Sequence, residues 1–432
     1  VLLVSMYVGS VTGGLITATL LRIPGTPASI MTTLDGYPMA RKGQAGRALG
    51  LGIGASLFGG MVAWVFLVTL AGPMATWSLM LGPFDFFAIV LVALVLIASV
   101  GGGSPMLGLF SGFLGILIAM PGVSPATGTP RWTLGFAELD DGFKLLPVLI
   151  GLFAVNQVIR ECLSLHQRPD MATRKRTTVV LRVGDWTGHI VNLLRSSLIG
   201  TGVGILPGIG ANIGSVIAYS AAKNASSHPE RFGRGCEEGI VAAESANNAT
   251  VGGALIPLIA MGIPGSVIDA ILLGALVIHG LQPGPLLMQQ NPLAVHTIMV
   301  TLLLANGFVF AVMTLAAGWI AKLAQVPRWI LLPLILTFCV VGSFALANRM
   351  FDVWVMLGFG VVGWALERSG VPLAPLVIGL VLAPIAEEHL SAGLMQSGGS
   401  FLPLITGPVA LTFCLLAAAM LIWTFTRKSA PV

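Results

Sequence analysis

The chain has 432 residues, of which 56% are hydrophobic and only 9% are charged. A soluble domain carries about 25% charged residues, so this composition excludes a soluble enzyme or binding domain and indicates a polytopic membrane protein. The net charge of +5 does not indicate nucleic-acid binding, because the basic residues stand at the ends of apolar segments, as membrane topology requires.

Apolar stretches of about 17 to 25 residues can cross a bilayer as helices, so we predict an all-α fold. In the first half of the chain the expected segments are residues 1–21, 48–70, 84–100, 106–120 and 143–159. An arginine-rich stretch, 160–185, follows and is expected to be cytoplasmic. In the second half the expected segments are 190–206, 209–222, 238–252, 254–281, 292–323, 330–347, 353–366, 373–386 and 402–426.

Short matches in the same order indicate an internal duplication. The matched pairs are 21–26 with 261–266 at an offset of 240 residues, 13–14 with 252–253, and 146–152 with 374–380 at an offset of 228. With this period, the first copy of the glycine-rich motif around Pro207 would lie roughly 33 residues before Val1. We therefore expect the chain to be truncated within its first repeat.

Equivalent loops of the two halves differ in charge. Loop 36–47 carries basic residues, whereas the equivalent loop 281–292 carries none. The next loop, 72–83, has no basic residue, whereas its counterpart contains Lys322 and Arg328. Because lysine and arginine collect on the cytoplasmic side, the charge pattern predicts that the two repeats are inverted.

The predicted organisation has four parts and about 10–12 membrane segments. They are a first transmembrane repeat (1–160, lacking its N-terminal part), a basic cytoplasmic linker (161–188), a second transmembrane repeat (189–390) and a C-terminal transmembrane helix (391–432).

Each repeat contains a helical hairpin that a Pro-Gly pair breaks in apolar sequence. A broken helix exposes backbone N–H groups at the start of its second half, where the helix dipole favours an anion. Paired breaks in matched positions point to a transporter binding site, although a single Pro-Gly pair can be a simple kink. The candidate substrate-binding residues at the breaks are Pro24, Gly25, Thr26, Pro264, Gly265 and Ser266.

A third break lies in the glycine-rich stretch 200–210. Pro207 and Gly208 interrupt the apolar run, and Gly210 and Asn212 follow. The stretch favours a re-entrant or unwound segment, while GxxxG-type helix packing is the alternative. It is not a dinucleotide-binding motif, because no strand precedes it.

Glu244, Asn247 and Asn248 stand at i, i+3 and i+4 and therefore share one helix face. Acidic and amide side chains at membrane depth are functional candidates, and their oxygen atoms suit a hard cation such as sodium. We predict a cation-coupling role, with interhelical hydrogen bonding as the alternative.

Three further sites carry charge. Arg22 precedes the first break and could bind a carboxylate with two parallel hydrogen bonds, or extend to the membrane interface. Asp35 closes the first hairpin and is expected to act as a cap. The sequence Glu387-Glu388-His389 resembles an interfacial acidic cluster with a possible role in proton coupling.

Several of these motifs resemble the TctA family, the large membrane subunit of tripartite tricarboxylate transporters. The resemblance covers essentially the whole chain and rests on residues 23–28, 32–40, 200–211, 262–266 and 279–285. The first Gly-Pro-Gly motif of the family is absent here. The resemblance implies a bacterial inner-membrane importer of citrate or related organic anions, driven by sodium or protons. It further implies a small TctB-like membrane subunit and a periplasmic TctC-like binding protein as partners.

Other function classes are less well supported by the sequence. An intramembrane enzyme would need a nucleophile with its base, paired aspartates or a zinc site, and the sequence contains no HExxH motif. The four cysteines lack metal-binding spacing, so we expect neither a metal nor a cofactor. A channel would need longer polar pore-lining stripes. We therefore predict a transporter rather than an enzyme.

Overall fold

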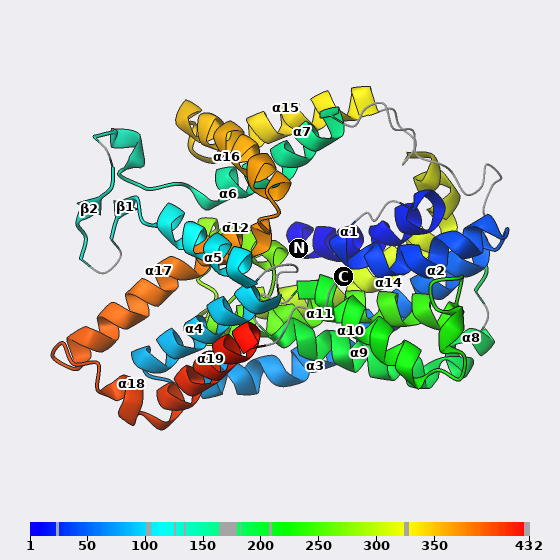
Figure 1. The fold of residues 1–432 in the computed structure, drawn as a ribbon, viewed down its shortest axis with the longest axis horizontal. Helices are drawn as coiled ribbons and strands as arrows, with labels where there is room; N and C mark the ends of the chain where they lie inside the picture. The colour runs from blue at the N-terminus through cyan, green and yellow to red at the C-terminus, as the bar shows by residue number, and fades with distance from the viewer. Residues whose placement is uncertain are drawn as a thin grey trace. The chain divides into compact units, whose positions relative to one another are not determined.

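The computed structural model describes residues 1–22, 26–100, 105–124, 127–133, 135–163, 179–181, 183–206, 210–323 and 328–426. Helices make up most of this part of the chain (Figure 1). Seven of its helices are long and apolar enough to cross a membrane, and shorter apolar helices accompany them. The predicted class, an all-α polytopic membrane protein, is confirmed.

The chain folds into two compact units, and each unit takes segments from both halves of the sequence. Unit 1 consists of Val1–Thr76, Gln167–Leu272 and His279–Val326. Unit 2 consists of Trp77–His166, Leu273–Ile278 and Pro327–Val432. These units are defined by packing, so the predicted repeat boundaries at 1–160 and 189–390 stay a prediction about the sequence.

Unit 1 contains the helices that follow the three Pro-Gly breaks. Its elements are α1 (Leu2–Leu21), η1 (Pro27–Ser29), α2 (Ile30–Arg41), most of α3 (Ala45–Ser78), α8 (Val183–Gly188), α9 (Ile190–Ile205), α10 (Gly210–Ala225), η4 (Pro229–Arg231), α11 (Glu237–Met261), the first part of α12 (Val267–Ile278), α13 (Leu287–Gln290) and α14 (Pro292–Leu323). Helices α9, α10 and α11 pack side by side (green in Figure 1).

Unit 2 is helical apart from one short antiparallel hairpin, β1 (Gly122–Val123) with β2 (Pro130–Arg131), within the residues described. Its other elements are α4 (Pro83–Val100), α5 (Pro105–Ala119), η2 (Ala137–Leu139), α6 (Leu145–Leu149), the π-helical segment η3 (Ile150–Val155), α7 (Asn156–Leu163), α15 (Arg328–Ala347), α16 (Met350–Arg368), α17 (Leu373–Gln396), α18 (Pro403–Thr406) and α19 (Pro408–Thr426).

Within each unit, elements of the two sequence halves pack in corresponding ways. In unit 1, α14 packs on α1. Helix α3 approaches α11, which corresponds to α1 in the predicted repeat, at Gly59 and Gly252. In unit 2, α17 packs on α4 and α5, while α16 packs on η3, α6 and α7. The internal duplication itself stays a prediction from the sequence. The inversion of the repeats stays a prediction.

Two helix boundaries predicted from the sequence are wrong. The stretch 36–47 is not a loop, because α2 continues through Pro38 to Arg41 and α3 begins at Ala45. Membrane helices tolerate an internal proline where nearby groups satisfy the freed backbone carbonyl. The gap expected at Gly253 is also absent, because α11 continues to Met261.

Glycines in α9 and α11 allow their backbones to approach closely. A Cβ atom on Gly200 would lie 2.3 Å from the carbonyl oxygen of Ala246, and one on Gly253 would lie 2.4 Å from that of Thr201. This is the small-residue packing typical of membrane helices. Helix α9 therefore stays regular to Ile205, so the unwinding expected across 200–210 is wrong for 200–205, and residues 207–209 lie outside the described part of the chain.

Candidate functional site

Helix α11 is the centre of unit 1. Every residue from Gly239 to Met261 is buried, because helices pack around its whole circumference. Its buried polar side chains are Glu244, Ser245, Asn247, Asn248 and Thr250. Polar groups cost free energy in an apolar interior unless they are paired, so this helix marks the candidate site.

The Glu244 carboxylate is completely buried and is contacted by hydroxyl groups from two other helices. Thr32 on α2 donates a short hydrogen bond to Oε1, and Ser56 on α3 donates to Oε2 at 3.2 Å. Among the described residues, no basic side chain forms an ion pair with Glu244. Hydroxyl groups can also act as acceptors, so the same three residues could turn their oxygen atoms toward a cation.

Asn247 and Asn248 lie on the face of α11 that carries Glu244, as the spacing predicts, but their surroundings differ. Asn248 Nδ2 donates to Thr12 Oγ1 at 2.9 Å, and the Thr12 hydroxyl donates to the carbonyl of Val8 at 2.9 Å. Asn247 is fully buried, and its amide makes no hydrogen bond of normal geometry with the described residues. The structure thus gives Asn248 an interhelical pairing, whereas the Asn247 amide lies close to the Glu244 carboxylate and has no such pairing.

Asp35 shows what a satisfied buried carboxylate looks like in the same unit. Its Oδ1 accepts hydrogen bonds from the backbone N–H groups of Gly233, Gly235 and Cys236, at 2.9, 2.9 and 2.8 Å. Its Oδ2 accepts from the Tyr219 hydroxyl at 2.7 Å. Asp35 lies within α2 rather than at the end of a hairpin, and its carboxylate fixes the loop before α11.

The second break follows directly from the end of α11. Gly262 adopts a left-handed conformation at φ 72°, and the chain turns through buried Pro264 and Gly265. A Cβ atom on Gly265 would lie 2.9 Å from the Gly204 carbonyl oxygen, so only glycine fits against α9. At the start of α12, Ser266 Oγ donates to Asp269 Oδ2 at 2.6 Å.

The first break has a corresponding geometry in the residues described. Helix α1 ends at Arg22, which adopts the same left-handed conformation as Gly262, with φ 56°. After the break, the Thr26 N–H donates to Ser29 Oγ at 3.2 Å. The Thr26 hydroxyl is buried and makes no hydrogen bond with the described residues. Pro24 and Gly25 lie outside those residues.

Described residues that flank the three breaks lie near the start of α10. A Cβ atom on Gly210, the first residue of α10, would lie 3.5 Å from Ser266 Cβ. The turn η1, which follows the first break, packs against α10 and α11. Pro207, Gly208 and the side chain of Asn212 lie outside the described part of the chain. The structure thus brings together the described ends of three segments that are far apart in sequence.

Arg22 lies beside this region rather than inside it. Its side chain is exposed, and Cζ lies 5.8 Å from the centroid of the Tyr37 ring. Arg22, Tyr37 and Arg41 line a cavity of about 280 Å³, with Thr33 and Leu34 among the other lining residues. Two arginines at one cavity suit a carboxylate. Arg22 also has a strained, left-handed backbone, and such strained residues cluster at functional sites.

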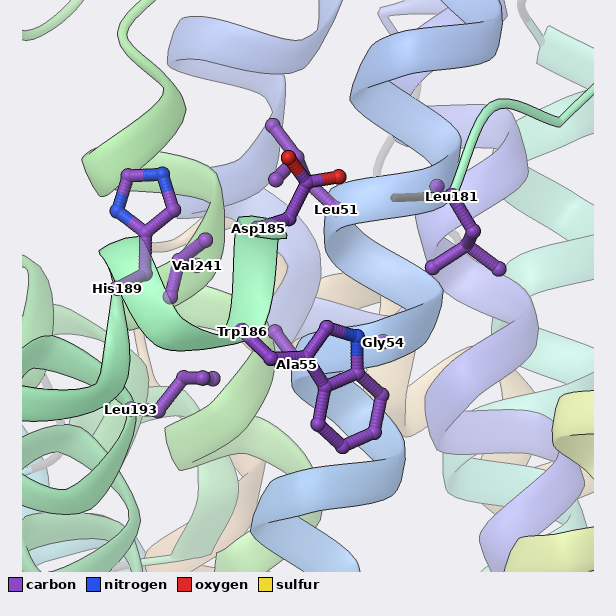
Figure 2. A pocket seen from close by; sticks show the side chains of 10 residues that line it. Leu51, Gly54, Ala55, Leu181, Asp185, Trp186, His189, Leu193 and Val241 are labelled. Atoms are coloured by element: carbon purple, nitrogen blue, oxygen red, sulfur yellow. The ribbon is translucent and has the colours of Figure 1, made fainter. Parts of the chain in front are cut away.

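A second cavity in unit 1 is too small for a substrate. Figure 2 shows Trp186 of α8 lying against α3 near Gly54. Asp185 and His189 also line this cavity. The cavity holds about 10 Å³, roughly one water molecule. Arg47 bridges Asp185 and Glu237 here and ties α3 to α8 and α11. We assign this region a structural role.

Glu387 belongs to unit 2 and is fully paired there. Arg131 forms two hydrogen bonds with its carboxylate, at 2.8 and 2.5 Å, and Ser124 adds a third at 2.6 Å. His389 stacks on Phe86. Arg131 and Glu387 are among the residues that line a cavity of about 730 Å³ in unit 2. The ion pair gives Glu387 a structural partner that the sequence does not reveal.

Asp269 is a site residue that the sequence analysis missed. It is completely buried, it touches Ser266, and its Oδ1 makes no hydrogen bond with the described residues. The available signal was an aspartate three residues after the Pro-Gly-Ser break, inside the apolar stretch 267–278. Within the described residues, no group of three or more His, Cys, Asp or Glu side chains could hold a metal ion.

A model of the tripartite tricarboxylate transporter TctA family matches residues 1–378 of the chain. The chain belongs to the TctA family. It is 32% identical over 422 residues to an uncharacterized 52.8 kDa protein in the TAR-I ttuC' 3' region of Agrobacterium vitis, covering 98% of this chain and 84% of that protein. It is 35% identical over 211 residues to an uncharacterized protein in the TAR-II ttuC' 3' region of the same organism, covering 49% of this chain and 87% of the relative. No solved structure matches this TctA chain.

Proposed function

We propose that this TctA protein imports tricarboxylates or related organic anions across the bacterial inner membrane, driven by a sodium or proton gradient. It would work with a TctB-like membrane subunit and receive its substrate from a periplasmic TctC-like binding protein. Family membership supports a transporter subunit and a multi-pass membrane location.

One observation carries the ion-coupling part of the proposal. Glu244 is 0% exposed on a helix buried along most of its length, and its described partners are the hydroxyls of Thr32 and Ser56. A buried carboxylate without a basic partner is costly to keep charged. Binding a sodium ion or a proton at Glu244 removes that cost, so cation occupancy and the state of the site are linked.

The breaks supply the anion side of the proposal. Thr26, Ser266 and the N–H groups that follow the breaks lie around the start of α10, where half-helix ends favour a carboxylate. Asn247, with its unpaired buried amide, would contribute to cation or substrate binding. Ser266→Ala or Asn247→Ala should therefore lower carboxylate uptake.

We test the function by uptake of labelled citrate into membrane vesicles that contain this subunit and its small membrane partner. The binding protein is added on the outer side, with and without an inward sodium or proton gradient. Accumulation above the outside concentration that needs both the binding protein and one gradient is the expected result. Uptake that only equilibrates citrate would indicate a channel, and uptake of any carboxylate without the binding protein would contradict the tripartite mechanism.

Replacing Arg22 by glycine separates its two possible roles. Glycine relieves a left-handed backbone that costs about 1 kcal/mol for other residues, so thermal stability should rise. If Arg22 binds the carboxylate, the KM for citrate uptake should increase about tenfold, as expected for the loss of one charged hydrogen-bonding contact. Arg22→Lys keeps the charge but loses the two-pronged geometry, and should show an intermediate KM. An unchanged KM in both variants would assign Arg22 to the membrane interface.

A further inference from the structure

The second break contains an acidic group that has no counterpart in the first. Asp269 stands at the position that Ser29 occupies in the matched repeat, 240 residues earlier. In the first break, Ser29 Oγ accepts the Thr26 N–H at 3.2 Å and donates to the Thr26 carbonyl at 2.8 Å. A neutral serine therefore completes this turn.

Capping of α12 does not explain Asp269. The Asp269 N–H donates to Ser266 Oγ at 3.3 Å, as in an ordinary helix N-cap. Its carboxylate, however, accepts the Ser266 hydroxyl at 2.6 Å, and its other oxygen is buried without a hydrogen bond to the described residues. The capping geometry alone would leave a buried carboxylate oxygen unsatisfied.

The surroundings of Asp269 are neutral oxygen donors. Tyr7 on α1 is 3% exposed, and its hydroxyl lies 3.2 Å from Ser266 Oγ. In the described part of the chain, Tyr7 is the titratable side chain that faces Asp269, while α11 and α10 present Ala254 and Gly210 near the break. Asp35 obtains four hydrogen bonds from its loop and Tyr219, whereas Asp269 has no comparable set.

A negative charge at Asp269 would also oppose anion binding at Ser266. Ser266 belongs to the break at which the carboxylate is proposed to bind, and its hydroxyl is engaged by Asp269. Neutralising Asp269 removes the repulsion and allows the Ser266 hydroxyl to turn toward a substrate. The geometry therefore links the charge of Asp269 to the ability of Ser266 to bind an anionic substrate.

We propose that Asp269, Ser266 and Tyr7 form a second site for a monovalent cation, a sodium ion or a proton, distinct from the site at Glu244. Carboxylate and hydroxyl oxygens are suitable ligands for sodium, and Asp269 can equally accept a proton. Cation binding here prepares the second break for the carboxylate. Each substrate is therefore transported with one cation in addition to the cation at Glu244. This inference rests on the proposed transport function.

The test is the ratio of cations to citrate transported in vesicles, measured with labelled sodium, labelled citrate and a pH-sensitive dye. Asp269→Asn should transport one cation fewer per citrate than the unmodified protein. The ion whose ratio falls identifies the occupant. An unchanged ratio for both ions would overturn the second site and leave the proposed function intact.

Two further variants keep the test decisive even if Asp269→Asn does not fold. Tyr7→Phe removes one hydroxyl ligand and should raise the KM for the coupling cation several-fold while keeping the cation ratio. Ser29→Ala changes the matched position of the first repeat and should leave the ratio and this KM unchanged. If Asp269→Asn is not recovered as folded protein, an unchanged KM in Tyr7→Phe overturns the site.

Binding without transport separates this inference from the proposed function. The purified protein is titrated with sodium chloride against choline chloride, and proton uptake is followed between pH 5 and 9. If citrate uptake fails, the site is still supported by a heat of sodium binding, or by the uptake of one proton, that is present in the unmodified protein and lost in Asp269→Asn. If Asp269→Asn retains both the sodium-binding heat and the proton uptake of the unmodified protein, the proposed Asp269 site is wrong.

Discussion

Replacing Glu244 by glutamine is expected to lower citrate accumulation by the factor that one coupled cation supplies. Glutamine keeps the size of the side chain: its oxygen can accept one of the Thr32 and Ser56 hydroxyls and its NH2 group can donate to the other, but it carries no charge for a cation. With a hundredfold cation gradient, coupling to one cation supports up to about a hundredfold accumulation, or roughly 2.7 kcal/mol. The variant should lose this factor in vesicle accumulation assays.

Glu238→Gln is the matched control for this prediction. Glu238 lies in the first turn of the same helix and is only partly buried, so the same chemical change should leave accumulation within about twofold. Both proteins must elute as folded protein in detergent. Equal accumulation by Glu244→Gln and the unmodified protein would remove Glu244 from the coupling mechanism.

Much of the fold could be predicted because the membrane limits the possible structures. Long apolar segments must be helical, and 292–323 was predicted with the bounds that α14 has. The spacing of Glu244, Asn247 and Asn248 predicted one helix face, which depends only on local geometry. These predictions needed no knowledge of long-range packing.

The predictions failed where tertiary contacts decide the outcome. The break expected near Gly253 is absent because Gly253 packs against the backbone of Thr201, a contact between distant segments. Asp269 was missed because its importance lies in its neighbours, Ser266 and Tyr7, and the latter is 262 positions away in the sequence. The Gly253 contact cannot be read from local sequence, and the local position of Asp269 after the break does not reveal its partners.

The buried acids of unit 1 separate into two kinds once their partners are known. Asp35 Oδ1 is contacted by three backbone N–H groups, which cannot act as acceptors, and only Oδ2 is contacted by a hydroxyl, that of Tyr219. Glu244 and Asp269 are contacted by hydroxyls, which can reverse their roles and face a cation. The chemistry of the neighbours, rather than burial, distinguishes the structural acid from the two functional candidates.

Asp35→Ala is expected to destabilise unit 1 by several kcal/mol. The substitution leaves the buried N–H groups of Gly233, Gly235 and Cys236 without their acceptor, and each such loss costs about 1–3 kcal/mol. The loop before α11 should open. Thermal unfolding in detergent should show a large fall in Tm, whereas Tyr219→Phe, which removes one donor to Oδ2, should cost about 1 kcal/mol.

Cys236 provides a direct readout of this opening. Its thiol is buried, and burial raises the pKa of the Cys236 thiol, so it should react slowly with a maleimide at neutral pH. In a background with serine at Cys162, Cys339 and Cys414, Asp35→Ala should label much faster than the parent, because opening exposes the thiol and the substitution removes a nearby negative charge. Equal labelling rates would show that other contacts fix the loop, and that Asp35 does not need its charge for this purpose.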